Sequence, residues 1–400
     1  MSFMFPKDFL WGTATAAHQV EGNNKNSDWW YWENRNRTGE PEWKAKWPLE
    51  PSLMACDSYN RYEEDFDLCV KLNNNAVRFS IEWARIEPVE GVFDHNEIEH
   101  YKKVLRAAKI RNLKTFVTLH HFTSPIWLAN IGGWLNPKVV DYFARYSKKC
   151  AEEFGDLVDI WLTINEPQVY NLISHLYGRW PPQARNPLKV LKVQQNQIKA
   201  HIKAYDEIKT VGNYKVGIVR NINWFAGFIW PLNKIFYYLN SYVFLNAIKS
   251  KMDLIGLNYY FTQVRNLKWI LHIDGRFPHG RYPLSDKSWS LNPTGIEQIL
   301  LGLKKYGVPI YITENGLADQ KDKFRVWYMN QILKYCARAM AKGVPLRGYF
   351  HWSLIDNYEW ADGYWPRFGL VEIDRENGLK RLPRPSFYFY ANICRTGRIN

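Results

Sequence analysis

Eight short apolar segments recur along the 400-residue chain, and each contains the β-branched or aromatic residues typical of a buried strand. They are Phe9–Thr15, Asn75–Trp83, Lys114–Phe122, Asp159–Asn165, Lys215–Ile222, Asp253–Tyr260, Pro309–Thr313 and Leu346–Trp352. Between them lie segments whose apolar residues recur every three or four positions, a pattern that predicts amphipathic helices. These are Ser58–Leu72, Asn96–Arg111, Val139–Phe154, Leu188–Thr210 and Phe324–Lys342.

This alternation of strands and helices predicts parallel strands joined by crossovers, and eight such units close into a (β/α)₈ barrel. An open doubly wound sheet is the alternative, but no G-x-G-x-x-G motif follows an early strand. No Ser/Gly-rich linker, low-complexity tract or shift in composition divides the chain. We therefore expect residues 1–400 to form a single α/β domain.

Polar residues follow the predicted strands at the ends where barrel enzymes carry their chemistry. The eight strand ends lead in turn to His18, Gln19 and Glu21; Arg78 and Glu82; His120 and His121; Asn165 and Glu166; Arg220 and Asn221; Asn258, Tyr259 and Tyr260; Glu314 and Asn315; and Trp352, Glu359 and Trp360. Any one of these could simply cap a strand or lie hydrogen-bonded in the core. Their presence at every strand end is what indicates a site.

Two carboxylates stand out because each directly follows an apolar strand, namely Glu166 and Glu314. They lie far apart in sequence, so only a closed fold would bring them together. Cleavage of a glycosidic bond requires one protonated carboxyl group to assist the leaving group and one ionised carboxylate to attack carbon or activate water. The pair therefore has the residue types that glycoside cleavage needs.

Five motifs resemble those of glycoside hydrolase family 1, in the family's order and over nearly the whole chain, and most closely its compact archaeal-type members. They are Phe9-Leu10-Trp11-Gly12-Thr13-Ala14-Thr15 with Gln19, Thr163-Ile164-Asn165-Glu166-Pro167, Ile312-Thr313-Glu314-Asn315-Gly316, Trp352-Ser353 with Asp356-Asn357-Tyr358-Glu359-Trp360, and Arg367-Phe368-Gly369-Leu370. The resemblance implies a β-glycosidase that retains anomeric configuration through a covalent glycosyl-enzyme.

Residue roles follow from the same resemblance. Glu166 would be the general acid/base and Glu314 the nucleophile, with Arg78 and Tyr260 hydrogen-bonded to Glu314. Asn165 would bind the sugar's 2-hydroxyl, and Trp352, whose bond to Ser353 is often a cis peptide in the family, would form the sugar platform. The remaining expected substrate-binding residues are Gln19, His121, Asn258, Glu359, Trp360 and Phe368.

The substrate expectation rests on Glu359 and Glu166. Members that act on 6-phosphorylated sugars carry phosphate-binding Ser and Lys residues where this chain has Glu359, whose carboxylate would repel phosphate. Thioglucosidases of the family replace the acid/base Glu by Gln, whereas Glu166 is intact. The sequence thus favours unphosphorylated β-glucosides, with galactosides, fucosides and alkyl or aryl glycosides as further candidates. A transglycosylating enzyme and an inactive carbohydrate-binding barrel remain the alternatives.

Two departures from the family concern the aglycone side. The chain reads His121-Phe122-Thr123-Ser124-Pro125 where many relatives have His-Trp-Asp-Leu-Pro, and it is short between Glu166 and Asn258. A more open entrance is expected. The shortened part holds an apolar stretch, residues 224–245, with three interpretations: a helix packed on the barrel, an apolar aglycone entrance, or a peripheral membrane or amphiphile contact. Pro231, Asn233 and Lys234 interrupt it, so we do not expect a membrane span.

The formal net charge of +14 raises nucleic acid and anionic membranes as partners. The basic residues are scattered, without zinc-finger spacing or a P-loop, so no nucleic acid is expected. Five widely spaced cysteines without a C-x-x-C pair indicate reduced thiols. Since the ten histidines show no H-E-x-x-H spacing, we expect no metal. No cofactor is expected either. The first eight residues lack the pattern of a signal peptide, which predicts a cytoplasmic location.

Overall fold

The computed structural model describes residues 3–34, 50–226, 230–264 and 282–399. Eight parallel strands form a closed barrel in the order β10-β11-β2-β3-β4-β5-β6-β8, and β8 pairs with β10 to close it. The strands are β2 (Leu10–Ala14), β3 (Ala76–Ser80), β4 (Lys114–His120), β5 (Ile160–Asn165), β6 (Lys215–Asn221), β8 (Leu254–Asn258), β10 (Ile310–Asn315) and β11 (Leu346–Trp352). The predicted (β/α)₈ barrel is confirmed.

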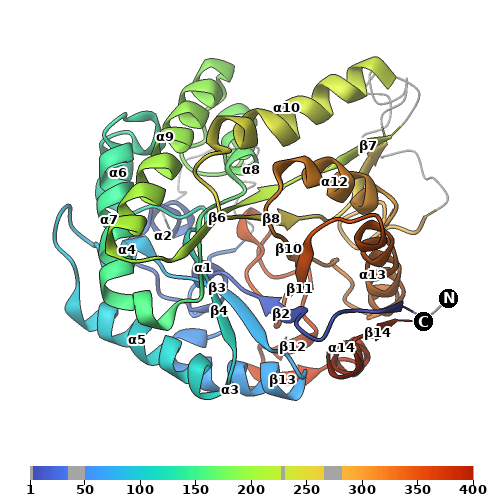
Figure 1. Ribbon diagram of the computed structural model, residues 1–400. Helices are drawn as coiled ribbons and strands as arrows, with labels where there is room; N and C mark the ends of the chain where they lie inside the picture. The colour runs from blue at the N-terminus through green and yellow to red at the C-terminus, as the bar shows by residue number, and fades with distance from the viewer. Residues whose placement is uncertain (1–2, 35–49, 227–229, 265–281, 400) are drawn as a thin grey trace.

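Helices surround the barrel on the outside, as Figure 1 shows. The crossovers carry α3 (Ser58–Lys71), α5 (His95–Ile110), α7 (Val139–Phe154), α9 (Pro187–Val211), α10 (Trp230–Ile248), α12 (Gly295–Leu303) and α13 (Arg325–Ala341), and α14 (Pro385–Thr396) follows the last strand. Shorter helices are α1 (Ala17–Val20), α2 (Asp28–Asn34), α4 (Trp83–Ile86), α6 (Ile126–Asn130) and α8 (Pro167–Asn171). Their apolar faces pack on the strands because amphipathic helices and sheets can bury apolar surface only against one another.

The interior of the barrel is filled by side chains, including those of Phe116, Leu162, Val219 and Phe350, all fully buried. The ring centroids of Phe116 and Phe350 lie 4.7 Å apart. Gly12 of β2 makes room for Phe350, because a Cβ at this position would lie 2.5 Å from its ring. Since these residues precede the last residues of their strands, the barrel is packed below its carboxyl end, and the polar residues lie above that packing.

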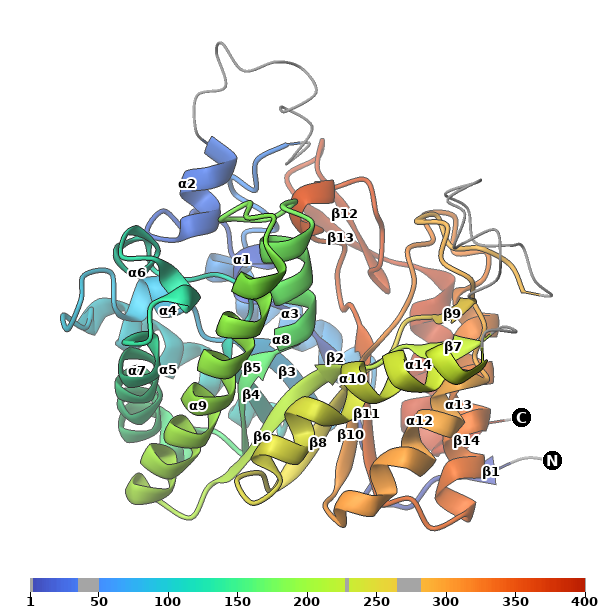
Figure 2. The ribbon, with the colours of Figure 1, turned by 90° about the horizontal axis from the view of Figure 1, so that it is seen from above.

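Small peripheral sheets complete the fold. The strands β1 (Phe3–Met4) and β14 (Arg398–Ile399) pair antiparallel, which places the two chain ends side by side (Figures 1 and 2). Two further pairs are β12 (Val371–Asp374) with β13 (Lys380–Pro383), and β7 (Trp224–Ala226) with β9 (Thr262–Val264). All five cysteines are free thiols, and four of them are buried.

The apolar stretch 224–245 spans β7 and most of α10, although its residues 227–229 lie outside the described part of the chain. Near the end of α10, Phe244 and Leu245 are buried, and the guanidinium of Arg220 lies 4.8 Å from the Phe244 ring centroid. Earlier in α10, Ile235 and Leu239 are more than half exposed. The end of this helix therefore packs on the barrel, as the first interpretation expects. None of the helices within the described ranges is long and apolar enough to cross a membrane.

Candidate active site

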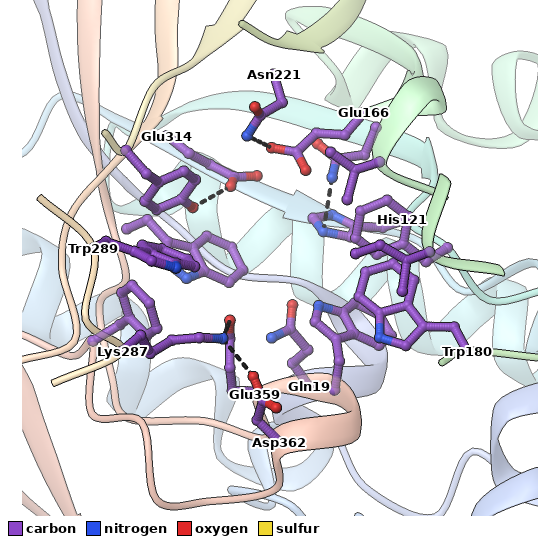
Figure 3. Close-up of a pocket in the computed structure, with 18 of the residues that line it drawn as sticks. Gln19, His121, Glu166, Trp180, Asn221, Lys287, Trp289, Glu314, Glu359 and Asp362 are labelled. Carbon is purple, nitrogen blue, oxygen red and sulfur yellow. Dashed lines mark hydrogen bonds and ion pairs between the residues drawn. The ribbon is translucent and has the colours of Figure 1, made fainter. Parts of the chain in front are cut away.

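A cavity of about 300 Å³ opens at the carboxyl ends of the strands (Figure 3). It is lined by the carboxylates Glu166 and Glu314 together with most of the substrate-binding residues expected from the sequence, namely Gln19, His121, Asn165, Trp352, Glu359, Trp360 and Phe368. These residues lie at the ends of strands or in the segments that follow them, and the closure of the barrel brings them together. The cavity therefore lies at the strand ends, where the polar residues of the sequence predict a site.

Glu314, at the end of β10, is held from two directions. The guanidinium Nη1 of Arg78 donates to its Oε1 at 2.5 Å, and the hydroxyl of Tyr260 donates to its Oε2 at 2.5 Å. Arg78 is fully buried, so its charge acts through little water. Both contacts stabilise negative charge on Glu314 and orient its oxygens. Figure 3 shows this carboxylate at the cavity wall, across from Glu166.

Glu166 follows β5 and occupies a different environment. Burial and the negative charge of Glu314 raise the pKa of its carboxyl group to about 8. The side-chain amides of Asn258 and Asn221 oppose this rise by donating to Oε1 at 2.7 and 3.0 Å. Glu166 also has a left-handed backbone, with φ of 43°, at the turn into α8. Such a conformation costs a non-glycine residue about 1–2 kcal/mol, and here it directs a carboxyl group into the cavity.

A hydrogen-bond network at the cavity wall links Arg78 through Asn165 to His121. Arg78 Nη2 donates to Asn165 Oδ1 at 2.7 Å, and Asn165 Nδ2 lies 3.1 Å from His121 Nε2. Burial and the nearby Arg78 charge hold the pKa of His121 well below its usual value, so the ring is neutral. With Nε2 accepting from Asn165, the ring proton is assigned to Nδ1, which has no protein partner among the described residues. His121 thus keeps a hydrogen-bond donor for a ligand.

Gln19 offers a hydrogen-bond acceptor, which complements the donor of His121. Its amide nitrogen donates to Asn357 Oδ1 at 3.1 Å and to the Tyr358 carbonyl at 2.8 Å. Its buried oxygen Oε1 has no protein partner in the described structure. A buried polar atom without a partner costs free energy, and a ligand hydroxyl would remove that cost. Gln19 and His121 together present one acceptor and one donor to a polyhydroxylated molecule.

Aromatic rings form the walls of the cavity. The imidazole of His121 is nearly parallel to the rings of Trp352 and Trp360, with interplanar angles of 25° and 20°. Trp289 lies at the opposite wall in Figure 3, and its ring centroid is 6.0 Å from that of Phe368. The Trp352–Ser353 bond is cis, as the family resemblance predicts. Flat apolar rings beside hydrogen-bonding groups match the apolar C–H faces and polar rim of a sugar.

The structure differs from the sequence expectation at Asn258. This residue is fully buried and does not line the cavity. Its amide donates to Glu166 Oε1, and its Oδ1 accepts from the Thr313 hydroxyl at 2.7 Å. Asn258 is the last residue of β8, and its side chain contacts Asn165 of β5 and Thr313 of β10 as well as Glu166. Asn258 therefore contacts Glu166 and is not among the residues that line the cavity.

Other residues of the cavity carry no signal in the sequence. Asn221 is the last residue of β6, and its position at a strand end does not by itself predict its contact with Glu166. Trp180, Lys287 and Trp289 line the cavity from loops. Loop residues follow neither strand nor helix periodicity, so no pattern in a single sequence marks them. In the described part of the chain, no group of three or more His, Cys, Asp or Glu side chains could hold a metal ion.

At the carboxyl end of a closed (β/α)₈ barrel, Glu314 receives a hydrogen bond from Arg78 and lies across from Glu166, whose pKa is raised. This arrangement defines the class of barrel enzymes whose chemistry uses two carboxyl groups. The model of the family described as "Glycosyl hydrolase family 1" matches residues 1–228 and 244–398. The chain belongs to this family, whose members are glycosidases with a retaining mechanism.

Similar proteins agree with this assignment. A 1,4-beta-D-glucan glucohydrolase of Thermotoga neapolitana is 33% identical over 443 residues, covering 98% of each chain. The solved beta-glycosidase from Pyrococcus horikoshii is 36% identical, with a TM-score of 0.89 over 100% of this chain and 97% of that one. The beta-glucosidase from Thermotoga maritima in complex with glucoimidazole is 31% identical, with a TM-score of 0.90, and 98% of this chain and 99% of that one are covered.

Proposed function

We propose that the protein hydrolyses terminal, unphosphorylated β-D-glucosides with retention of configuration, through a covalent glycosyl-enzyme on Glu314. The observation that carries the proposal is the contrast between the two carboxyl groups. Glu314 receives a guanidinium and a phenol, whereas burial and the Glu314 charge raise the pKa of Glu166 to about 8. One group is prepared to attack and the other to donate a proton at neutral pH.

In the first step, a Glu314 oxygen attacks the anomeric carbon as the bond to the aglycone oxygen breaks, and Glu166 donates its proton to that oxygen. A covalent ester forms and neutral alcohol leaves. Loss of the Glu314 charge then lowers the pKa of Glu166, which becomes a base. In the second step, Glu166 takes a proton from water, water oxygen attacks the anomeric carbon, and the ester bond breaks. Free sugar leaves, and both carboxyl groups return to their first state.

The sugar is held by the groups that line the cavity. Gln19 Oε1 accepts from a hydroxyl, His121 Nδ1 donates to one, and Asn165 lies beside the anomeric position for the 2-hydroxyl. Such contacts accelerate the reaction to the extent that they strengthen as the ring becomes oxocarbenium-like. Trp352 and Trp360 pack on the sugar face. The names of the similar proteins support a glucoside substrate, and galactosides, fucosides and alkyl or aryl glycosides are further candidates.

We expect kcat/KM for an aryl β-glucoside to decrease at alkaline pH with an apparent pKa near 8, set by Glu166. The first step needs the protonated acid, so activity is complete below this pKa and is lost as pH rises through it. Replacement Asn221→Leu removes a donor that stabilises ionised Glu166, and it should therefore move the alkaline limb to higher pH. Measurement of kcat/KM from pH 5 to 10 tests both statements. An alkaline limb that does not respond to Asn221→Leu would contradict the assignment of that limb to Glu166.

A panel of 4-nitrophenyl glycosides tests the proposed activity. We expect turnover of the β-D-glucoside, and much weaker turnover of the α-D-glucoside and of the β-D-glucoside 6-phosphate. Nuclear magnetic resonance of the first product should show the β-anomer. Sugar binding without turnover of any β-glycoside would favour the inactive carbohydrate-binding barrel. Formation of alkyl glycoside as the main product in dilute methanol would favour the transglycosylating alternative.

The contact of residues 224–245 with membranes or amphiphiles stays a prediction. The described part of α10 exposes Ile235, Tyr238 and Leu239 by at least half of each residue's surface, and such apolar surface is what contact with an apolar molecule would use.

A further inference from the structure

Lys287 brings a positive charge into the cavity at a place that the catalytic steps do not use. It lies in the loop before α12, lines the cavity, and is only 13% exposed at its side chain. Figure 3 shows it at the end of the cavity that is opposite Glu166 and Glu314, together with Glu359 and Asp362. Burial of a lysine costs free energy unless its charge is paired, so Lys287 needs negatively charged partners at this place.

Two carboxylates orient the ammonium group. Lys287 Nζ lies 2.6 Å from Asp362 Oδ2 and 3.2 Å from Glu359 Oε1. Burial opposes the charge of Lys287, but the two carboxylates outweigh it and raise the pKa of the ammonium above its usual value. The group is therefore charged at neutral pH and carries three N–H donors. Two of them are used by Asp362 and Glu359, which leaves the third for a ligand in the cavity.

The position of the catalytic pair determines which part of a sugar would reach Lys287. With the anomeric carbon between Glu166 and Glu314, the ring extends toward the far end of the cavity. In Figure 3 His121 and Gln19 lie on one side of that path, and Trp289 and Lys287 lie on the other. Asn165, hydrogen-bonded to His121, is on the side of the 2-hydroxyl. The hydroxymethyl group on carbon five is across the ring from carbons two and three, and it therefore points to the side of Trp289 and Lys287.

We propose that Lys287 is a specificity-determining residue of the sugar site, and that its ammonium donates a hydrogen bond to the 6-hydroxyl of the sugar, while Glu359 accepts from a hydroxyl at the same end. This inference rests on the proposed β-glucosidase function and names the group that the site recognises. The aromatic ring of Trp289, whose centroid lies 5.0 Å from Lys287 Nζ, confines the ammonium from the side.

The charges at this end favour a neutral hydroxymethyl group over an anionic one. Lys287 contributes one positive charge, and Glu359 and Asp362 contribute two negative charges. Arg179 lies 3.2 Å from Asp362, but its side chain is 46% exposed and is well screened by water. A carboxylate or phosphate on carbon six would meet Glu359 beside an ammonium that is already neutralised. A hydroxyl can donate to Glu359 and accept from Lys287 without this repulsion.

The replacement Lys287→Met tests the proposal, because Met keeps the length of the side chain and removes the donor and the charge. Two substrates are compared, 4-nitrophenyl β-D-glucoside and its 6-deoxy analogue, which differ only in the 6-hydroxyl. We expect the replacement to lower kcat/KM about tenfold to a hundredfold for the glucoside, the range for loss of a hydrogen bond to a charged group. For the 6-deoxy analogue we expect a decrease of less than about threefold, because its missing hydroxyl has no contact to lose.

Lys203→Met is the matched control. Lys203 lies on α9 and pairs with Asp141 at 2.5 Å on the outside of the barrel, so this replacement removes the same side chain and the same charge away from the cavity. It should change neither substrate's kcat/KM. Thermal unfolding of both variants shows whether they are folded at the assay temperature.

The outcomes are distinguishable. Equal losses for the two substrates would show that Lys287 only supports Glu359 and Asp362, and would overturn the inference while leaving the proposed function intact. Faster turnover of 4-nitrophenyl β-D-glucuronide than of the glucoside by the unmodified protein would also overturn it, because an anionic group would then be preferred. If the unmodified protein hydrolyses no β-glycoside at all, the proposed function fails and the inference fails with it.

Discussion

Replacement Glu314→Ala is expected to abolish hydrolysis of 4-nitrophenyl β-D-glucoside. The methyl group cannot form the glycosyl ester, and Glu166 alone cannot replace the missing nucleophile. Loss of a nucleophile that forms a covalent intermediate costs on the order of 10⁶ in kcat in a hydrolase of another class, and we expect a loss of similar size. Steady-state release of nitrophenol at saturating substrate measures the effect.

A small anion such as azide should restore turnover to the Glu314→Ala variant, and the configuration of the product should show which face of the sugar is attacked. The space vacated by the carboxylate lies beside Arg78 and Tyr260, whose donors would face azide or formate. Azide would attack the anomeric carbon from the side that Glu314 occupies, while Glu166 still protonates the leaving group. The product should be the α-glycosyl azide, whose configuration identifies the attacked face.

The control for this variant is Glu99→Ala, which removes a carboxylate on α5 that pairs with Lys102 at 2.9 Å outside the cavity. Its turnover should equal that of the unmodified protein. Unchanged turnover in Glu314→Ala, or a β-configured azide product, would remove Glu314 from the role of nucleophile.

Replacement Glu166→Gln should separate substrates by their leaving groups. Gln keeps the shape of the side chain and can still accept from Asn221 and Asn258, but it cannot donate a proton as an acid does. General acid assistance is worth about 10²–10⁴ in rate, and a poor leaving group needs all of it. We expect kcat/KM for methyl β-D-glucoside to fall by about this factor, and kcat/KM for the 2,4-dinitrophenyl glucoside to change far less.

The same variant should lose the alkaline limb near pH 8, because the group that titrates there is absent. Azide should again accelerate turnover, but here after glycosyl-enzyme formation, and it should give the β-glycosyl azide. The opposite configurations expected from the two variants place the two carboxyl groups on opposite faces of the sugar. Equal losses for the methyl and dinitrophenyl glucosides would contradict the acid role of Glu166.

The strands of the barrel could be predicted closely from the sequence. β4 is observed over Lys114–His120 where Lys114–Phe122 was predicted, and β11 over Leu346–Trp352 agrees at both ends. Strands buried on both faces are short continuous apolar runs, and this signal is local. The ends of β5 and β10 also marked Glu166 and Glu314, because parallel strands deliver their last residues to one face of the barrel. The resemblance to family 1 then assigned the two roles.

Other features depended on contacts between distant residues. The pKa of Glu166 is raised to about 8 by burial and by Glu314, two effects that arise only once the barrel is closed. Asn258 was expected to face the substrate, but the packing of β8 turns its amide to Glu166. Lys287 gave no signal, since its loop has no periodic pattern and its partners Glu359 and Asp362 are distant in sequence.

The sequence by itself therefore determined the fold, the family and the two carboxyl groups, because strand hydrophobicity and the motifs at strand ends are local properties of the chain. The tertiary structure decided how those carboxyl groups differ and placed the ammonium of Lys287 in the cavity beside Glu359 and Asp362. Burial, charge and hydrogen-bond geometry act across space, and they exist only when the strands and loops of the barrel are in place.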